Sequence, residues 1–213
     1  MLKREGWRDN HKRVYRLYRE QGLSLRLKRP RRNKSALKRQ PQPQGLYPNH
    51  VWGMDFVSDA LFDGRRLRLL TVIDLYTREC LGICVGQNLR SSEVAEMLDT
   101  IALRRPLPQL LKTDNGSEFA GKMLDKWVYE RDIRIDFSRP GTPTDNATVE
   151  SFNGRLRQEC LNENWFMSKE DARCKIEVWR IHYNQSRPHF ALGWMTPCEF
   201  AEKSAGCQNK QPT

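Results

Sequence analysis

A proline-rich segment divides this sequence into two parts. Residues 40–48 read Gln-Pro-Gln-Pro-Gln-Gly-Leu-Tyr-Pro, and three prolines in nine positions exclude a helix, because proline lacks a backbone N–H and clashes with the preceding turn. The 213 residues are enough for one mid-sized domain and a small appendage. We therefore predict a basic helical arm over 1–39, an extended linker over 40–50, one globular domain over 51–203 and a tail over 204–213.

Charge divides the chain at the same place. Residues 1–50 carry 15 Lys and Arg against 3 Asp and Glu, whereas the remaining residues carry 22 against 23, so the first quarter accounts for the whole net charge of +11. A basic arm on a near-neutral body indicates a polyanionic partner. The alternative is a solvated basic tail without a partner.

The arm is predicted to hold one short helix over residues 10–21. Its apolar side chains share one face and its Lys and Arg side chains fill the other. Asn10 is suited to cap the start of this helix, and Gly22 is suited to end it. The apolar stripe is too narrow to build a core of its own.

The body alternates between strand and helix patterns, with Asp63-Gly64 as a hairpin turn signal. The expected strands are 51–57, 67–75, 80–85, 109–113 and 133–137, and the expected helices are 91–104, 119–130, one starting near Asn146, and 169–183. Residues 139–145 form a Pro/Gly/Thr loop. This order predicts an α/β domain around one sheet.

The sequence disfavours a membrane protein, a secreted protein and a zinc-finger protein. No apolar run reaches the roughly 18 residues of a membrane span, and the first residues lack the apolar stretch of a signal peptide, so we expect an intracellular protein. The six cysteines form no CxxC pair and have no histidine at zinc-finger spacing. They are expected to be free thiols that pack as small apolar side chains.

Three carboxylate residues occupy positions that suggest a functional role. Asp55 lies inside the apolar strand Trp-Gly-Met-Asp-Phe-Val, Asp114 lies where a strand ends before Asn-Gly, and Glu150 lies early in a helix. Each has an ordinary explanation: an edge-strand residue, a plain turn, and a charge that complements the helix dipole.

Taken together, the three carboxylates indicate a metal site. A strand, a strand end and a nearby helix can bring them to one point, and hard oxygen ligands suit Mg²⁺ or Mn²⁺. Two such ions, about 3.5–4 Å apart, can activate an attacking oxygen and stabilise a leaving oxygen during phosphodiester attack.

The residues around the carboxylates resemble a known family. Trp52-Gly-Met-Asp55-Phe, Thr113-Asp-Asn-Gly-Ser-Glu-Phe119 and Pro140-Gly-Thr-Pro-Thr-Asp-Asn-Ala-Thr-Val-Glu150 are similar to the integrase-core transposases of bacterial insertion sequences, of the IS-three family and OrfB type. The spacing of 35 residues between Asp114 and Glu150 is that of this DDE group, whose catalytic region resembles retroviral integrases. Tyr183-Asn-Gln-Ser-Arg-Pro-His189 is similar to the C-terminal signature of the family, and the resemblance covers about residues 2–201.

The resemblance implies a fold and a reaction. The expected fold is a mixed five-stranded RNase H-like sheet flanked by helices and preceded by the basic helical arm. The expected reaction is cleavage at insertion-sequence ends, which frees a 3′-OH, and attack of that hydroxyl on target DNA, with Asp55, Asp114 and Glu150 holding two Mg²⁺ or Mn²⁺ ions once DNA is bound. No covalent protein–DNA intermediate is expected. Glu118 is either an extra ligand or part of a solvated helix start.

The resemblance also implies DNA contacts. The family has a basic residue seven positions after the glutamate, here Arg157, and this spacing puts Glu150 and Arg157 on one helix face. The alternatives are an ion pair with Glu159 or Glu163, or simple exposure. Two asparagines are expected to support the carboxylates by hydrogen bonding. The predicted DNA-contacting residues are Arg157, Asn153, Asn115, Lys12, Arg13, Arg16, Arg29, Arg31, Arg32, Arg187 and His189.

The expected partners are double-stranded DNA, from element ends and targets, and further copies of the chain when DNA is bound, in the nucleoid of a bacterial cytoplasm. The sequence departs from the family at Thr142, where relatives often have lysine, and at its start, which falls partway into the helical region. We therefore expect an N-terminally truncated chain without the upstream helix-turn-helix and leucine-zipper segments. Two alternatives stay open: a truncated remnant that only binds DNA, and an RNase H-type nuclease.

Overall fold

The computed structural model describes residues 6, 10–23, 45–114, 116, 119, 121–138 and 146–208. The chain divides into two compact units, Met1–Pro41 and Gln42–Thr213. Within the described ranges, no helix has the length and apolar character needed to cross a membrane.

The first unit contains one described helix, α1 (His11–Glu20). The Asn10 side chain accepts a hydrogen bond from the backbone N–H of Lys12 at 3.0 Å, and Gly22 has a left-handed backbone with φ of 68°. Both residues therefore bound the helix as predicted, by a side-chain N-cap and a glycine end. The helix buries none of its residues in this unit.

The second unit alternates strands and helices, as expected. It contains, in chain order, β1 (Val51–Ala60), β2 (Arg66–Asp74), β3 (Cys80–Gly86), α2 (Ser91–Ala102), β4 (Leu110–Thr113), α3 (Lys122–Glu130), β5 (Arg134–Phe137), α4 (Ala147–Leu156), the π-helix η2 (Arg157–Leu161), α5 (Lys169–Ser186), the 3-10 helix η3 (Phe190–Leu192) and α6 (Pro197–Gln208). The predicted boundaries differ by up to three residues. The π-helical turn and α6 were not predicted individually.

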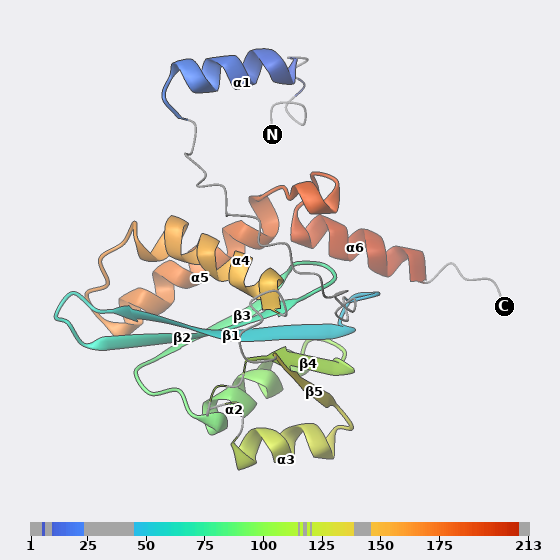
Figure 1. Ribbon diagram of the computed structural model, residues 1–213. Coiled ribbons are helices and arrows are strands. Elements are labelled where there is room, and N and C mark those ends of the chain that lie inside the picture. Colours follow the sequence, from blue (N-terminus) through green and yellow to red (C-terminus); the bar gives the residue numbers. More distant parts are fainter. Residues whose placement is uncertain are drawn as a thin grey trace, which may run out of the picture. The chain divides into compact units, whose positions relative to one another are not determined.

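The sheet is mixed and five-stranded, with the order β3-β2-β1-β4-β5. The strands β1, β2 and β3 pair antiparallel, whereas β4 pairs parallel with β1 and β5 pairs parallel with β4. The helices α4, α5 and α6 lie on one side of the sheet, and α2 and α3 lie on the other (Figure 1). The expected RNase H-like arrangement of one mixed sheet between helices is therefore confirmed.

Successive side chains of β1 pack alternately into two hydrophobic cores, one on each face of the sheet. Val51 and Val57 pack in the cluster that includes residues of α4 and α5, whereas Trp52 and Met54 pack in the cluster of α2 and α3. Because successive strand residues point to opposite faces, the odd-numbered positions of β1 face α4. A Cβ on Gly53 would stand 2.5 Å from Val149, so the glycine lets α4 approach the strand closely.

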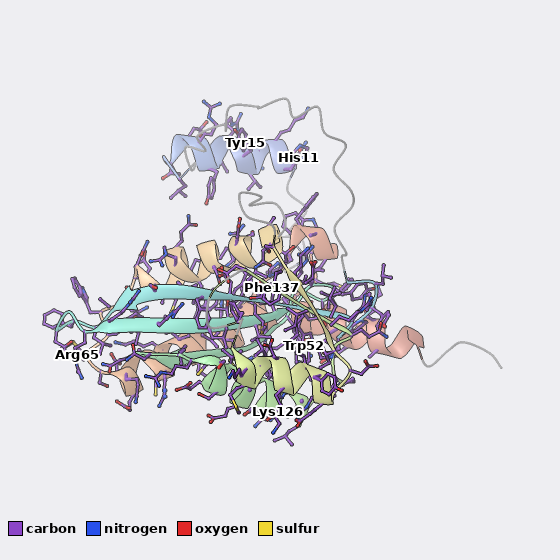
Figure 2. All side chains as sticks on the ribbon, turned by 60° about the horizontal axis from the view of Figure 1, so that its bottom comes forward. His11, Tyr15, Trp52, Arg65, Lys126 and Phe137 are labelled. Atoms are coloured by element: carbon purple, nitrogen blue, oxygen red, sulfur yellow. The ribbon has the colours of Figure 1, made fainter. Side chains whose placement is uncertain are left out.

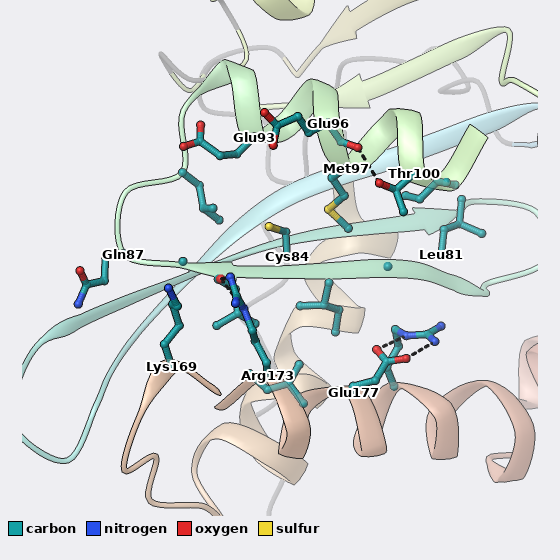
Figure 3. A pocket seen from close by; sticks show the side chains of 18 of the residues that line it. Leu81, Cys84, Gln87, Glu93, Glu96, Met97, Thr100, Lys169, Arg173 and Glu177 are labelled. Atoms are coloured by element: carbon teal, nitrogen blue, oxygen red, sulfur yellow. Dashed lines mark hydrogen bonds and ion pairs between the residues drawn. The ribbon is translucent and has the colours of Figure 1, made fainter. Parts of the chain in front are cut away.

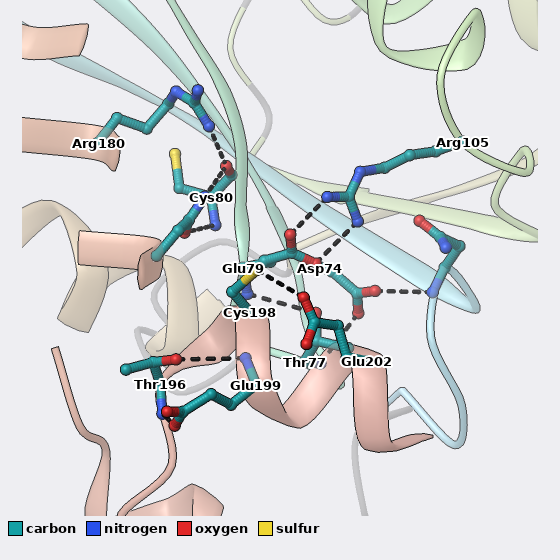
Figure 4. A network of polar contacts seen from close by, with 12 residues as sticks. Asp74, Thr77, Glu79, Cys80, Arg105, Arg180, Thr196, Cys198, Glu199 and Glu202 are labelled. Carbon is teal, nitrogen blue, oxygen red and sulfur yellow. Dashed lines mark hydrogen bonds and ion pairs between the residues drawn. The ribbon is translucent and has the colours of Figure 1, made fainter. Parts of the chain in front are cut away.

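A polar network holds the turn between β2 and β3 (Figure 4). Arg105 donates to both carboxylate oxygens of Glu79, at 2.5 and 2.8 Å, and the Glu79 side chain is only 6% exposed. Asp74 accepts hydrogen bonds from the backbone N–H groups of Asn49 and Tyr76, each at 2.7 Å. These contacts fix one end of the sheet, and the same turn holds Arg78 in a left-handed conformation, with φ of 62°.

Candidate active site

Asp55 lies near the middle of β1, at an odd-numbered position that faces α4, and it is partly buried. One carboxylate oxygen accepts a hydrogen bond from the backbone N–H of Phe56 at 2.7 Å, and the other accepts one from the Asn153 side chain at 2.9 Å. The carboxylate is therefore held in one orientation by two donors.

Asn153 is itself oriented by Thr71, which pairs with Asp55 in the register of β1 and β2. The Thr71 hydroxyl donates to the Asn153 side-chain oxygen at 2.9 Å and lies 3.1 Å from the Asp55 backbone oxygen. Because the hydroxyl occupies the amide oxygen, the amide NH₂ must face the carboxylate. Asn153 and Thr71 are both buried, so Asn153 supports Asp55 from inside the protein.

Asp114 directly follows β4, and its position follows from strand register. In the parallel pairing of β1 with β4, Gly53 aligns with Lys112, and the same register extended by two residues sets Asp114 beside Asp55. Adjacent strands lie about 4.8 Å apart, and equivalent positions point to the same face. The exposed Asp114 side chain accepts a hydrogen bond from the Gly116 backbone at 3.0 Å. Asn115 and Glu118 lie outside the described residues.

Glu150 projects from the first turn of α4 and is exposed, while its neighbours Val149 and Phe152 pack into the core. Arg157 follows at the end of this helix, where the π-helical turn begins. The Arg157 guanidinium donates to the backbone oxygen of Ser58 in β1 at 2.8 Å. This bond anchors an exposed cation against the strand that carries Asp55.

The negative charges of Asp114 and Glu150 both act on the carboxylate of Asp55. The pKa of Asp55 is raised from its ordinary 3.8 to about 6, chiefly by burial and further by the negative charges of Asp114 and Glu150, while the hydrogen bonds from Phe56 and Asn153 lower it. Crowded carboxylates disfavour their charged forms, and a bound cation would relieve this cost. The set of hard oxygen donors fits Mg²⁺ or Mn²⁺.

Within the described ranges, no three Asp, Glu, His or Cys side chains are grouped closely enough to hold an ion. Asp55 is the fixed member of the triad, whereas the side chains of Asp114 and Glu150 are exposed. Binding of a shared ion would therefore require these two side chains to turn toward Asp55.

Of the other predicted contact residues in the second unit, Arg187 and His189 have partners away from Asp55. Arg187 forms an ion pair with Glu159, and the His189 ring packs edge-on against Tyr183 with ring centres 5.0 Å apart. On α1, the Lys12, Arg13 and Arg16 side chains are exposed, whereas Arg29, Arg31, Arg32 and Thr142 lie outside the described residues. Sequence reasoning missed Thr71, although a hydroxyl inside the apolar run of β2 was a usable signal.

A sizeable pocket in the described part of the chain lies away from the carboxylates. It measures about 710 Å³ and is bounded by the edge strand β3 and the helices α2 and α5 (Figure 3). Its acidic side chains Glu93, Glu96 and Glu177 stand among the cations Lys169 and Arg173. None of the three candidate ligands lines it, so size alone does not identify the active site.

Comparison with family models identifies the integrase core domain twice. One model of an integrase core domain matches residues 46–143, and a second matches residues 131–197. Together they span the sheet, α4 and α5, and therefore all three carboxylates.

Three insertion-element proteins are similar over most of this chain. A protein of element IS407 from Burkholderia multivorans is 45% identical over 95% of this chain and 73% of its own length. A protein of element IS476 from Xanthomonas euvesicatoria is 44% identical over 90% of this chain, and this chain spans 55% of its length. The putative transposase InsK of element IS150 from Escherichia coli is 29% identical over 95% of this chain and 75% of its own length.

Solved structures with the same fold are viral integrases. A chain of the simian T-cell lymphotropic virus intasome, in complex with a PP2A regulatory subunit, has a TM-score of 0.66 at 21% identity, over 78% of this chain and 60% of that chain. The HTLV-2 integrase catalytic core domain in complex with magnesium has a TM-score of 0.59 at 19% identity, over 74% and 99%. With the similarity to the insertion-element proteins, the conclusion is that this chain belongs to the DDE integrase-core transposases of bacterial insertion sequences.

Proposed function

We propose that this chain cleaves DNA at the ends of an insertion sequence and joins the freed 3′-OH to target DNA, with Asp55, Asp114 and Glu150 as ligands of its divalent metal ions. The observation that supports the proposal is that Asp55, Asp114 and Glu150 are carried on one face of the sheet. The register of β4 extended to Asp114 and the start of α4 at Glu150 support this arrangement, and their charges add to burial in raising the pKa of Asp55.

Different residues of the site are proposed to have different roles. When bound, Mg²⁺ or Mn²⁺ would supply the charge that activates the attacking oxygen and stabilises the leaving one. Asn153 and Thr71 are positioning residues, because they hold the Asp55 carboxylate without facing the substrate. Arg157, anchored on Ser58, would hold a DNA phosphate on the same flank of α4 as Glu150.

The proposed partners are DNA and further copies of this chain. The basic arm would bind phosphates without reading sequence, because Lys and Arg contacts to phosphate carry little base information. Neighbours in fold include a chain of an intasome and an integrase core described in dimeric and trimeric forms. We propose that this chain also acts as an oligomer on paired DNA ends.

Purified chain incubated with Mg²⁺ or Mn²⁺ and labelled element-end DNA tests the proposal. We expect end cleavage and strand joining by the parent, and loss of both in the variants Asp55→Asn, Asp114→Asn and Glu150→Gln, because each loses one hard ligand charge with little change of shape. Near-normal activity of one variant would remove that residue from the ligand set.

The same assay separates the two alternatives. A remnant that only binds DNA would retain duplex in a mobility assay but give no product with either metal. A general RNase H-type nuclease would cut RNA–DNA hybrids and would not join the cleaved end to a second duplex. Either result from the parent would overturn the proposed function.

A further inference from the structure

The flank of α4 opposite the carboxylates carries a second cavity. It measures about 400 Å³, and its lining includes Arg78, Thr148, Ser151, Arg155, His189 and Phe190. Two residues along an α-helix turn by about 200°, so Thr148 and Arg155 face away from Glu150 and Arg157. The proposed metal site and this pocket therefore lie on opposite flanks of one helix.

Arg78 is held in this pocket by an unusual backbone. It is a non-glycine residue with φ of 62°, a strained conformation that clusters at functional sites. The polar network around Asp74 and Glu79 fixes the turn that imposes this conformation. The Arg78 guanidinium is partly buried and donates to the Thr148 hydroxyl, and among the described residues its other N–H groups have no further acceptor.

Positive charge exceeds negative charge around the pocket. Arg155 and Arg187 share one carboxylate, Glu159, and Arg78 adds a third cation, whose acidic neighbour Asp74 is already engaged by backbone N–H groups. Three arginines against two carboxylates favour an anionic ligand.

His189 responds to this excess of positive charge. Burial and, after it, the charges of Arg187, Arg155 and Arg78 together lower the pKa of His189 to about 4. The ring is therefore neutral at pH 7, and its buried Nε2 atom has no hydrogen-bond partner in the described structure. A ring nitrogen in this state can donate to an anion without adding charge.

An exposed aromatic pair lies in the loop that continues from His189. Phe190 is 79% exposed and Trp194 is 57% exposed, and their rings meet edge-on with centres 5.6 Å apart. Trp194 and the preceding Gly193 both have left-handed backbones, with φ of 67° and 66°. Aromatic faces beside cations are how proteins stack the bases of unpaired nucleic acid.

The crest of α4 between its two flanks is bare. Ala147, Ser151 and Gly154 are all exposed there, and no atom of the described residues lies within 4 Å of where a Cβ on Gly154 would be. Packing therefore does not require this glycine, although glycine inside a helix is destabilising relative to alanine. A crest of small side chains lets another backbone approach closely.

We propose that the pocket of Arg78, Arg155 and His189 holds a phosphodiester of a DNA strand that crosses α4 from the carboxylates, with an unpaired base stacked on Phe190 and Trp194. The inference rests on the proposed function for its ligand, DNA, and adds to it a subsite for a single-stranded flank.

Fluorescence anisotropy on the full chain in EDTA tests the subsite apart from catalysis. The probes are a 20-base-pair duplex of arbitrary sequence, either blunt or with a tail of five thymidines at one 3′ end. We expect the parent to bind the tailed probe at least about fivefold more tightly, because each stacked base contributes about 1–3 kcal/mol. Substitution of both Phe190→Ala and Trp194→Ala should abolish this preference.

Arg155→Gln tests the phosphate contact, and Arg65→Gln is its matched control. The Arg155 side chain is 51% exposed and the Arg65 side chain 59%, so neither substitution disturbs the core. Arg65 lies at the tip of the β1–β2 hairpin, at the other end of β1 from Trp52 (Figure 2). Arg155→Gln should lower the slope of log affinity against log salt by about 0.7 on the tailed probe, and Arg65→Gln should leave the preference for the tail unchanged.

Photocrosslinking identifies the residues that the tail contacts. A tail carrying 5-iodouracil should crosslink to Phe190 or Trp194, as identified by mass spectrometry of the digested adduct. Equal affinity for both probes, equal effects of the two arginine variants, or crosslinks only elsewhere would each overturn the subsite. If the parent cleaves and joins DNA but shows these results, the inference fails alone, whereas activity that survives Asp55→Asn refutes the proposed metal site instead.

Discussion

The stability of the metal-free protein is expected to depend on the ionisation of Asp55. Its pKa lies at about 6 in the folded chain and near 3.8 when unfolded, chiefly because burial disfavours the charged carboxylate. A difference of about two pKa units corresponds to about 3 kcal/mol. Since the side chain is only partly buried, solvent screening reduces the expected contribution to about 2 kcal/mol.

The direction in which stability changes with pH follows from proton binding. Between pH 3.8 and about 6 the folded state binds more protons at Asp55 than the unfolded state does, so the free energy of unfolding falls as pH rises through this window and levels off above it. Asp55→Asn removes this dependence. It also turns an acceptor into an NH₂ group beside the donors of Phe56 and Asn153, which costs about 1 kcal/mol at every pH.

Urea unfolding in EDTA at pH 4.5 and pH 7.5 measures the difference. The parent should lose about 1.3 kcal/mol more than Asp55→Asn between these values, because pH 4.5 to 7.5 covers about two thirds of the full titration difference, and the pH-independent cost of the substitution cancels. Excess Mg²⁺ at pH 7.5 should raise the unfolding free energy of the parent and leave the variant unchanged, because only the native ligand set binds the ion. Parallel pH profiles for the two proteins would refute the argument that Asp55 is buried among like charges.

Three further predictions concern the support of the site, its flank and the arm. Thr71→Val should lower the unfolding free energy by about 1–3 kcal/mol and slow DNA cleavage, because the Asn153 oxygen loses its hydrogen-bond donor. Thr100→Val, at an exposed position, is the control and should have neither effect. Urea unfolding and DNA turnover measure both variants. Arg157→Ala should weaken DNA binding and activity while Mg²⁺ still stabilises the free protein, and Arg157→Lys should restore part of both. If the alanine variant keeps the affinity and turnover of the parent, Arg157 is an ordinary surface residue. Deletion of residues 1–45 should weaken binding to any duplex and flatten its salt dependence, and an unchanged slope in a salt titration would contradict an arm-borne affinity.

Local patterns in the sequence were sufficient for the element order and for the candidate ligands. Asn10 and Gly22 bound α1 as expected, because capping depends on a few neighbouring residues. The alternation of apolar residues located the strands, and the spacing of Asp55, Asp114 and Glu150 within their motifs indicated the family. Element ends were displaced by up to three residues, since helix and strand ends respond to tertiary contacts.

Only the tertiary structure decided how these residues meet. Thr71 comes to hold Asn153 because β1 and β2 pair in one register and α4 packs on that face, and a shift of one residue would turn Asp55 to the other core. Arg78, Arg155 and His189 come from a turn, a helix and a loop far apart in the sequence, so no local pattern connects them. Local signals act over a few residues, whereas the direction of a side chain and its partners depend on pairing between distant segments, which the completed fold alone determines.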